Sequence, residues 1–564
     1  MPDPVLRGDL SRVRPGAAGG CRRRGRAPGG TGLPGGGSPG HVFPRPAPRP
    51  ARLRDRGEPA RGNRRARRGP RGGIVKRTRL DPRPDSTLFE SGGPDREGFR
   101  LPPLDVPPCD LPERDPDRFR PDIEGFPRLS EVEVVRHYTR LSKRNFGIDD
   151  GLYPLGSCSM KHNPKIGEEI AREEGFRDVH PLQPGSTVQG CLQLQWELER
   201  YLAEITGMAG FTLQPSAGAQ GEFAGLLIVR ARQRDRGENR SVVLIPDSAH
   251  GTNPASARLA GYRVEEIPSD SRGCIDPDRL RRRLGADVAA LMLTNPNTLG
   301  IFETGIEAIC AEVHACGGLV YCDGANLNAV VGISRPGDAG IDILHVNLHK
   351  TFSTPHGGGG PGAGPLGVTE DLLPYLPVPR VVREGDRFRL DSDRPRSIGR
   401  LHAFYGNFLV TLRAWAYVLA NGPEGLRRVA EGAVLNANYL RALLEEDYAV
   451  AFPTRSLHEV VFSDRKLEAT GVRTLDVAKR LIDYGFHPPT IYFPLIVRGA
   501  MMVEPTETET VQELEAFAAA LRQIAAEARR DPERVRTAPH TAPVGRLDET
   551  GAARRPVLRW PGRG

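Results

Sequence analysis

The chain has 564 residues and a formal net charge of +9, and it is long enough to bury a large core without disulfides or structural metals. The charge is uneven, because residues 1–80 hold 21 of the 79 Lys and Arg but 4 of the 70 Asp and Glu, giving +17 there and −8 over the rest. The acidic remainder argues against the simplest interpretation of a basic protein, which is nucleic-acid binding.

Residues 1–80 are rich in Arg, Gly and Pro and poor in aromatic and branched side chains, so they predict a disordered extension. An RNA-binding arm and an organellar transit peptide are the functional alternatives. Transit peptides are Ser-rich and amphipathic, whereas this stretch has two serines, Ser11 and Ser38, and no recurring apolar face.

The sequence contains no run of about 18 apolar residues and no secretory signal core, so we expect a soluble, cytoplasmic protein that does not enter membranes. Its eight cysteines are scattered without a C-x-x-C pair, which argues against a zinc site and against a disulfide framework. We therefore expect no metal.

The rest of the chain divides by its pattern into four segments. Residues 81–185 are Pro-rich with one helix at 130–145, and they predict an N-terminal arm that wraps a neighbour. Helices with a few strands over 386–530 predict a smaller C-terminal α/β domain, and 531–564 is expected to be an extended tail.

The segment between them, 186–385, is expected to form the large domain. A helical stripe at its start is followed by short apolar runs that alternate with helical segments. This alternation is typical of βαβ units and predicts a mainly parallel sheet. The five runs are 241–246, 262–268, 289–295, 317–323 and 341–347.

Polar residues follow these runs, at the edge where an open α/β sheet binds its ligand. His250, Asn295, Asp323 and Lys350 each come just after a predicted strand or at its end. A lysine in such a cleft can form a Schiff base with pyridoxal phosphate (PLP). Asp323 suits the role of partner to the ring nitrogen, and His250 could stack on the ring.

The remaining requirements of PLP are also met. Its phosphate needs backbone N–H groups at a helix N-terminus, and the small-residue turn from Ser216 to Gln220 opens a predicted helix. The glycine-rich run after Lys350 lets backbone approach closely. Each residue also has an ordinary structural interpretation, such as a solvated lysine or a helix cap, so the argument depends on their shared location.

Two other interpretations of the glycines fail on context. A nucleotide-binding P-loop requires G-x-x-x-x-G-K-[ST], and no lysine follows these glycines. "HGGG" at 356–359 is similar to an esterase oxyanion loop, but the G-x-S-x-G match at 36–40 lies upstream in the predicted disordered extension.

Long motifs over about residues 88–560 resemble the P-protein family of the glycine cleavage system. They include "YPLGSCSMKHNPK", "VLIPDSAHGTNPASA", "YCDGANLNAVVG", "NLHKTFSTPHGGGGPGAGPLGV" and "EPTETET". The resemblance is closest to the PLP-carrying half of the split form, glycine dehydrogenase (decarboxylating) subunit 2. It implies a PLP-dependent transferase of fold type I.

The resemblance also implies site roles. Lys350 would carry PLP, Asp323 would pair with the ring nitrogen, and His250 would stack on the ring. Two histidines that flank the lysine would line the substrate side. Those two are His349 and His356, and the further expected cofactor contacts are Ser216, Ala217, Gly218, Gln220, Asn295, Ala325 and Thr351.

The implied reaction begins with glycine, which loses its carboxylate as CO2. Its aminomethyl group then passes to the lipoyl arm of H-protein. The implied assembly is an α2β2 heterotetramer with glycine dehydrogenase subunit 1.

Two alternatives remain open from the residues. An aminotransferase or aldolase on the same fold would grip the substrate carboxylate with an arginine, for which Arg396 and Arg400 are available. A non-catalytic scaffold would bind a partner subunit or nucleic acid through the basic extension, and its function would not need Lys350.

Overall fold

The structure is a computed structural model that describes residues 87–91, 102–103, 105–107, 126–356 and 362–560. The predicted disorder of residues 1–80 lies outside these ranges. The segment before the sheet carries four short helices: α1 (Leu88–Ser91), α2 (Glu131–Ser142), α3 (Lys165–Ala171) and α4 (Glu174–Arg177). Helix α2 confirms the expected helix at 130–145.

The start of α2 follows from its sequence. The Ser130 side chain accepts the backbone N–H of Glu133, and the Glu133 carboxylate accepts the backbone N–H of Ser130 at 2.9 Å. This reciprocal capping box satisfies two backbone donors that the first helical turn leaves free.

The predicted mainly parallel sheet is confirmed. In the described chain it has seven strands, in the order β1-β7-β6-β5-β4-β2-β3, and the five from β3 to β6 are parallel. All five predicted apolar runs form strands. The strands are β1 (Gly210–Thr212), β2 (Val242–Pro246), β3 (Arg263–Ile267), β4 (Val288–Thr294), β5 (Leu319–Gly324), β6 (Ile343–Val346) and β7 (Leu366–Val368).

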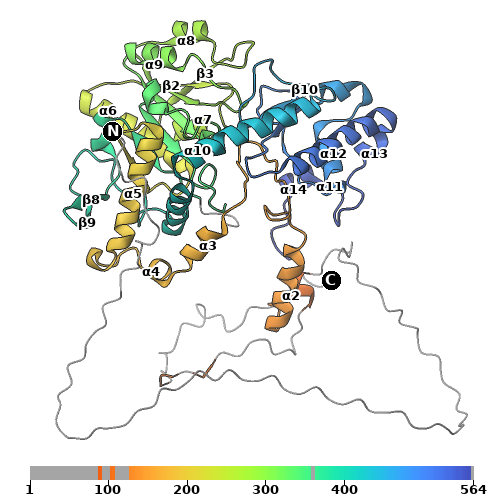
Figure 1. The fold of residues 1–564 in the computed structure, drawn as a ribbon, viewed down its shortest axis with the longest axis horizontal. Helices are drawn as coiled ribbons and strands as arrows, with labels where there is room; N and C mark the ends of the chain where they lie inside the picture. Colours follow the sequence, from red (N-terminus) through yellow and green to blue (C-terminus); the bar gives the residue numbers. More distant parts are fainter. Residues whose placement is uncertain (1–86, 92–101, 104, 108–125, 357–361, 561–564) are drawn as a thin grey trace, which may run out of the picture. The chain divides into compact units, whose positions relative to one another are not determined.

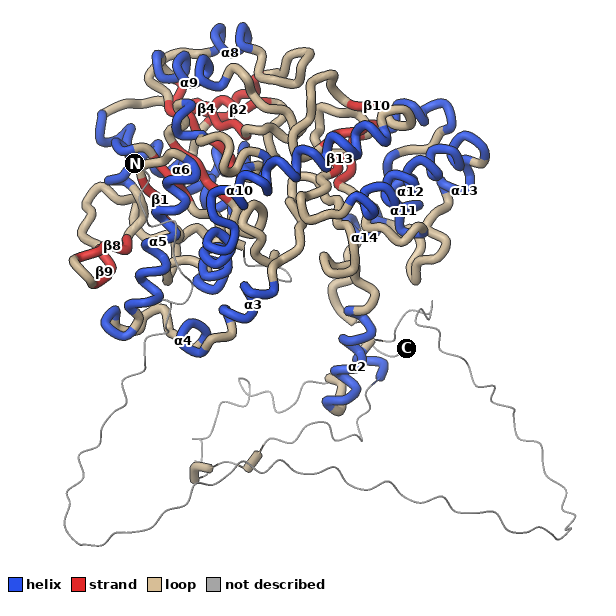
Figure 2. The backbone as a smooth tube through the Cα atoms, viewed as in Figure 1, coloured by secondary structure: helices blue, strands red, loops and turns tan. Residues whose placement is uncertain are grey.

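Helices cover both faces of this sheet (Figures 1 and 2). Alternate residues of β2 enter different cores: Val242 and Leu244 join one apolar cluster, while Val243 and Ile245 join the other. This is the period of two expected for a strand that is buried on both faces. The helices of the domain are α5 (Gln189–Thr206), α6 (Gly218–Arg236), α7 (Thr252–Leu259), α8 (Pro277–Arg283) and α9 (Ile306–Ala315).

A hairpin and a long kinked helix lead to the C-terminal region. The hairpin is β8 (Arg380–Glu384) and β9 (Arg387–Asp391), and α10 (Phe408–Leu444) bends at Gly422, where φ is 61°. An antiparallel sheet follows, in the order β10-β11-β13-β12. Its elements are β10 (Ala449–Val450), β11 (Val460–Ser463), β12 (Thr490–Ile491) and β13 (Ala500–Val503), with α11 (Thr474–Asp483) and α12 (Val511–Arg530).

The C-terminal segment differs from the expected extended tail. It contains two short helices, α13 (Pro532–Arg536) and α14 (Glu549–Arg554). Proline occupies the first turn of α13, where its missing N–H costs nothing, and the Asp548 side chain caps α14 by accepting the N–H of Gly551. These local signals override the polar composition that suggested an extended chain.

Part of the N-terminal arm lies against the C-terminal sheet. Leu155 forms an antiparallel bridge with Val503, and the buried Lys161 pairs with Glu507 at 2.8 Å and donates to Asn328 at 2.8 Å. The ion pair joins the arm to the C-terminal region, and the hydrogen bond to Asn328 joins it to the large domain.

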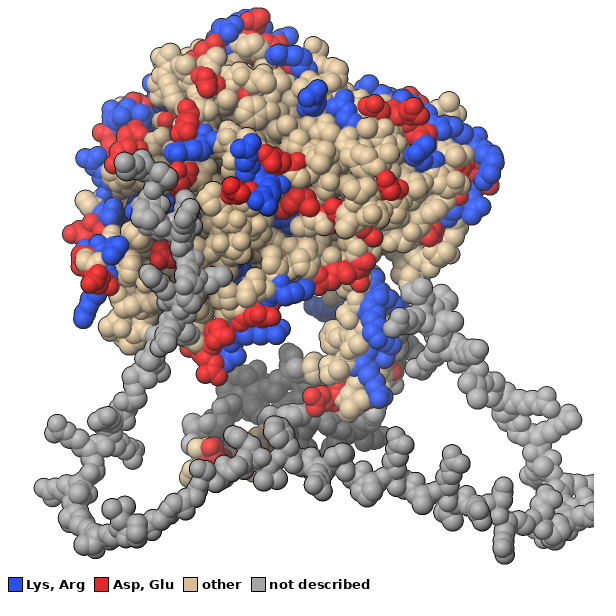
Figure 3. Space-filling model, viewed as in Figure 1, with Lys and Arg blue, Asp and Glu red and all other residues tan. Residues whose placement is uncertain are grey.

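The surface carries both charge signs. On the face drawn in Figure 3, acidic and basic side chains are interspersed over the described body, so that opposite charges offset one another. Among the described helices, none has both the length and the apolar composition needed to cross a membrane.

Candidate active site

A pocket of about 170 Å³ lies at the carboxyl ends of the parallel strands. Three of its lining residues, His250, Asp323 and Lys350, follow or end β2, β5 and β6, as the sequence predicted from the strand-end rule. The full lining comprises Ser157, Gly218, Ala219, Glu222, His250, Thr252, Thr294, Thr298, Asp323, Ala325, Asn326, His345, Asn347, His349 and Lys350.

Lys350 sits in a tight turn after β6, where its backbone N–H donates to the carbonyl of Asn347 at 3.1 Å. Within the described residues, its ammonium makes no hydrogen bond or ion pair. The neighbouring His349 accepts the N–H of Ala363 at Nδ1, at 3.2 Å. Gly362 passes so close to this imidazole that a Cβ there would collide with it, which explains a glycine at that position.

Asp323 belongs to a buried polar chain. His345 stands opposite it on β6, with its Nε2 3.2 Å from Asp323 Oδ1, and its Nδ1 is 2.7 Å from the Tyr321 hydroxyl. Asn253 donates to Asp323 Oδ2 at 3.1 Å, and the Ala325 N–H donates to Oδ1 at 2.9 Å. Although burial opposes ionisation, His345, Lys350 and these donors lower the pKa of Asp323, so its carboxylate is ionised.

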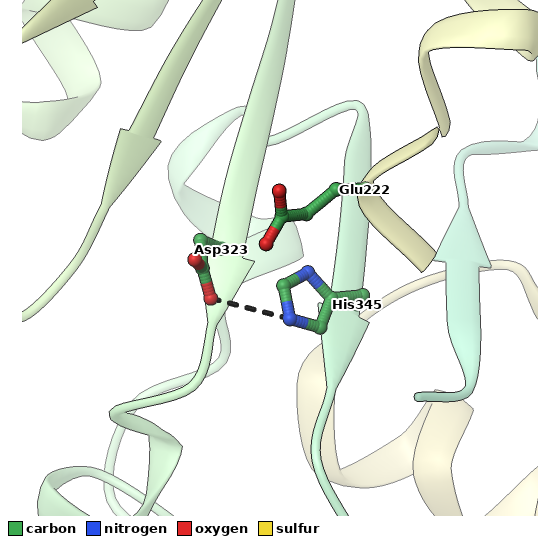
Figure 4. Close-up of side chains that lie close together, drawn as sticks. All are labelled: Glu222, Asp323 and His345. Atoms are coloured by element: carbon green, nitrogen blue, oxygen red, sulfur yellow. Dashed lines mark ion pairs between the residues drawn. The ribbon is translucent and has the colours of Figure 1, made fainter. Parts of the chain in front are cut away.

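Glu222 approaches the same carboxylate and imidazole from α6 (Figure 4). Ligand atoms of Glu222, Asp323 and His345 lie within 4.8 Å of one another, a spacing at which a cation could bind. The Glu222 oxygens, however, accept hydrogen bonds from Thr252 at 2.7 Å and Ser256 at 2.8 Å. These bonds tie α6 to α7, and the absence of a metal stays a prediction.

His250 lies at the exposed rim of the pocket. Its Nδ1 accepts the N–H of Thr252 at 3.2 Å, and its ring meets that of Phe493 edge-on, with centroids 5.5 Å apart. His250 lines the pocket, and its stacking role stays a prediction.

The N-terminus of α6 opens onto the pocket. Gly218 and Ala219 line the pocket, and Ala217, the N-cap, has no side chain that could accept the helix's free N–H groups. Ser216 is fixed to Gln220, because its N–H and hydroxyl both donate to Gln220 Oε1 at 2.7 and 2.9 Å. A 19-residue helix that presents free N–H groups to a cavity is suited to bind a phosphate.

Several buried polar atoms around the pocket have no partner, which is the pattern expected of a site built for a ligand. They include Thr351 Oγ1 and Thr294 Oγ1, both almost fully buried. A Cβ at Gly218 would lie 2.6 Å from Asn347 Nδ2, so glycine is needed where the helix N-terminus meets the site. With a free lysine amine and an ionised Asp323, these features fit PLP.

The two flanking histidines are neutral. Burial, followed by the nearby His356 and Lys350, lowers the pKa of His349 to about 3, and burial and Lys350 lower that of His356 to about 4. Their ring centroids are 5.0 Å apart. At neutral pH they can therefore donate or accept a hydrogen bond without placing a positive charge beside the lysine.

Six of the expected site residues are absent from the pocket lining, namely Ser216, Ala217, Gln220, Asn295, Thr351 and His356. One of them, Asn295, forms its side-chain hydrogen bond with a nearby loop. Asn295 Oδ1 accepts the backbone N–H of Glu303 at 3.1 Å, and Asn295 is absent from the pocket lining. From the same stretch of chain, Thr294 and Thr298 line the pocket. Ala325 does line the pocket and also supports Asp323 through its N–H.

A second buried cluster stands behind the pocket wall. Ser157 and Ser159 adopt left-handed backbone conformations, with φ of 63° and 45°, which cost non-glycine residues about 1–3 kcal/mol each. Their N–H groups donate to Glu459 and Glu504, respectively, at 2.8 Å each. The intervening Cys158 is half-buried, and desolvation raises the pKa of its thiol to about 11, so little of the nucleophilic thiolate forms at neutral pH.

His458 of this cluster predicts a pH-dependent stability. Burial and the charge of Lys350 lower its pKa to about 3 in the folded protein, against about 6.5 in the unfolded chain. Between these values the unfolded chain binds a proton that the folded protein does not, so stability falls as pH falls below 6.5. Glutamine does not titrate, so the free energy of unfolding of His458→Gln should rise by about 2 kcal/mol relative to that of the wild type when the pH is lowered from 8 to 5.

Urea unfolding of both proteins at the two pH values measures this difference. His180→Gln is the control, because His180 is exposed, and its difference from the wild type should not change with pH. A His458→Gln difference that is the same at pH 8 and pH 5 would contradict the assigned neutral state.

Two family models match the chain. One, described as glycine dehydrogenase, C-terminal domain, matches residues 429–541, and the other, described as aminotransferase class-V, matches residues 222–366. Proteins named probable glycine dehydrogenase (decarboxylating) subunit 2 are similar over most of the chain. That of Halalkalibacterium halodurans is 54% identical over 84% of this chain and 97% of its own, and that of Pyrococcus abyssi is 54% identical over 84% and 95%.

Solved structures share the fold. The glycine decarboxylase (P-protein) of the glycine cleavage system, in an inhibitor-bound form, aligns with a TM-score of 0.60 at 23% identity, covering 74% of this chain and 92% of its own. A sphingosine-1-phosphate lyase from Burkholderia pseudomallei aligns with a TM-score of 0.55 at 16% identity, covering 76% and 95%. At these identities the alignments show the fold, which is the predicted PLP-dependent transferase fold type I with an added C-terminal domain.

Proposed function

Because the chain belongs to the family of glycine dehydrogenase (decarboxylating) subunit 2, we propose that it is the PLP-dependent subunit that decarboxylates glycine and passes the aminomethyl group to a lipoyl disulfide. The observation that carries this proposal is the pocket that brings Lys350, Asp323 and the α6 N-terminus together in a chain 54% identical to such subunits.

The chain's residues would hold PLP at four points. The Lys350 amine would hold its carbonyl group, the Asp323 carboxylate would accept the ring N–H, and the N–H groups at Gly218 and Ala219 would bind its phosphate. His250 would cover the ring from the pocket rim. When bound, PLP supplies an electron-withdrawing ring that stabilises the electron pair left on the glycine α-carbon as CO2 departs.

The protein controls the charge of this site. His345 and Asn253 keep Asp323 ionised, so that it can hold a proton on the ring nitrogen. Neutral His349 and His356 orient the substrate without forming an ion pair with the carboxylate that must leave. Loss of a carboxylate is favoured when no cation stabilises it in the ground state.

The positions of two arginines disfavour the aminotransferase or aldolase alternative. Arg396 is exposed and lies 3.7 Å from Asp235, and neither Arg396 nor Arg400 lines the pocket. The described pocket lining contains no arginine to grip a substrate α-carboxylate.

The family name implies a partner subunit. We propose that this partner is glycine dehydrogenase subunit 1 in an α2β2 assembly, and that the acceptor is the lipoyl arm of H-protein. A cytoplasmic location stays a prediction from the sequence.

The test is the exchange of labelled bicarbonate into the carboxyl group of glycine. Purified chain with PLP and lipoylated H-protein is assayed with and without subunit 1. We expect exchange in the complete mixture and a large loss when either protein partner is omitted. A complete mixture that shows no exchange, while PLP remains bound to Lys350, would contradict the proposed reaction and retain the cofactor assignment.

A further inference from the structure

A carboxyl pair outside the cofactor contacts lies directly behind the pocket wall. Glu459 immediately precedes β11 and Glu504 immediately follows β13, and the register of these antiparallel strands pairs Val460 with Val503. The next pair of the ladder therefore places the two carboxylates side by side. Both side chains are almost fully buried, with 0% and 1% of their surface exposed.

The two carboxylates have unequal hydrogen bonding. Glu504 accepts two bonds from Ser159, from the N–H at 2.8 Å and from the hydroxyl. Glu459 accepts one bond, from the Ser157 N–H at 2.8 Å, and its Oε1 has no partner. Burial raises the pKa of both carboxyls, and the carboxylate that accepts more hydrogen bonds keeps its charge more easily. We therefore assign the charge of the pair to Glu504 and the proton to Glu459.

Electrostatics supports this division. An imidazole nitrogen of His458 and a carboxylate oxygen each of Glu459 and Glu504 lie within 4.8 Å of one another. Two negative charges at that distance in a buried site repel strongly. The groups facing Glu459 are Glu504, Lys350, Cys158 and the neutral His458. Burial and Glu504 raise the pKa of Glu459 well above its usual range.

The proposed reaction needs a proton. Glycine is a zwitterion with no net charge, and the aminomethyl product carries an ammonium group. The Cα–carboxyl bond breaks and its electron pair reduces the disulfide, so that a C–S bond forms and the S–S bond breaks. The second sulfur leaves as a thiolate and becomes a thiol only by taking up one proton, which is consumed in each turnover.

We propose that Glu459 stores this proton and delivers it to the pocket through the hydroxyl of Ser157. This inference rests on the proposed function. Ser157 lines the pocket and donates its N–H to Glu459, while its hydroxyl and Glu459 Oε1 both lack a partner. A rotation about the Ser157 Cα–Cβ bond is therefore needed to bring this hydroxyl to the carboxyl and then toward the pocket. Glu459 then regains a proton from solvent between turnovers, while Glu504 stays ionised.

The main test is Glu459→Gln, which keeps the shape and an acceptor for the Ser157 N–H but has no carboxyl proton to release. In the presence of subunit 1 and lipoylated H-protein, we expect glycine-dependent CO2 release at pH 7.5 to fall about 100-fold, with PLP binding retained. The wild-type rate should fall at high pH as Glu459 loses its proton. This alkaline limb of the pH–rate profile should be absent from Glu459→Gln.

Three further variants separate a proton role from a structural one. Glu504→Gln removes the repelling charge, so it should lower the pKa of Glu459 and move the alkaline limb to lower pH. Ser157→Ala should slow CO2 release while Glu459 remains protonated. Glu303→Gln changes another buried carboxyl, which accepts the Ile275 N–H away from the pocket, and should stay within about twofold of the wild-type rate.

Infrared spectroscopy tests the proton without relying on activity. The wild type minus Glu459→Gln difference at neutral pH should show the C=O stretch of a protonated carboxylic acid. Absence of that band would overturn the proposal, and this includes the case in which a bound cation has replaced the proton. A wild-type rate of CO2 release in Glu459→Gln, with the fall at high pH unchanged, would overturn it as well. If the variant fails to fold, an unshifted limb in Glu504→Gln and a wild-type rate in Ser157→Ala overturn it. A wild type that shows the band without releasing CO2 would refute the proposed function alone.

Discussion

Replacing Lys350 by alanine is expected to abolish glycine decarboxylation, with a loss of at least about 10⁴-fold. No other lysine lines the described pocket, so none is placed to replace its amine. The variant should also lose the absorbance that PLP shows when it is bonded to a lysine. Release of labelled CO2 from carboxyl-labelled glycine, measured with both protein partners present, and the absorption spectrum of the purified protein check these expectations.

Two controls accompany this variant. Lys165→Ala removes an exposed lysine of α3 that pairs with Asp149 at 2.7 Å, and it should leave the rate unchanged. Deletion of residues 1–80 should also leave activity nearly unchanged, whereas a scaffold that acts through its basic extension would lose its function. Substantial activity in Lys350→Ala, or its loss on deletion of the extension, would contradict the assigned role of the lysine.

The strand-end rule explains why part of the site could be predicted from sequence alone. Each parallel strand delivers the residue that follows it to the same edge of the sheet, so the positions of His250, Asp323 and Lys350 follow from the apolar runs. Helix α6 could be placed in the same way, because small residues precede a long helical pattern.

The partners of these residues depend on strand register, which periodicity does not reveal. His345 lies within an apolar run and looks like part of a buried strand, and only the pairing of β5 with β6 sets it opposite Asp323. Glu459 and Glu504 are 45 residues apart and meet through the register of β11 and β13. Ser157 and Ser159 could not be anticipated either, because serine gives no signal for a left-handed backbone.

Asn295 shows what the strand-end rule leaves undetermined. It follows β4 and was therefore expected at the cofactor, but its side chain turns back to cap the N–H of Glu303. Asn side chains commonly bond nearby backbone in turns, and this local bond competes with a role at the strand end. The strand-end rule locates the residue without fixing the direction of its side chain.

Asp323→Asn is expected to retain PLP while decarboxylating glycine at least about 100-fold more slowly. The amide cannot carry the negative charge that keeps a proton on the ring nitrogen, so the ring withdraws electrons less strongly. The helix N-terminus at Gly218 and the Lys350 amine remain to hold the cofactor. Titration with PLP and the kcat for CO2 release measure the two effects separately.

The buried chain behind Asp323 sharpens this prediction. Asn253 and His345 both present N–H groups to the carboxylate, and an amide nitrogen at position 323 would face one of these donors. Asp342→Asn is the matched control, because Asp342 precedes β6, accepts the Val320 N–H at 2.7 Å and lies outside the pocket. It should keep the wild-type rate. A wild-type rate in Asp323→Asn would remove the carboxylate from the mechanism, and the ionised state that His345 and Asn253 maintain would then need another purpose.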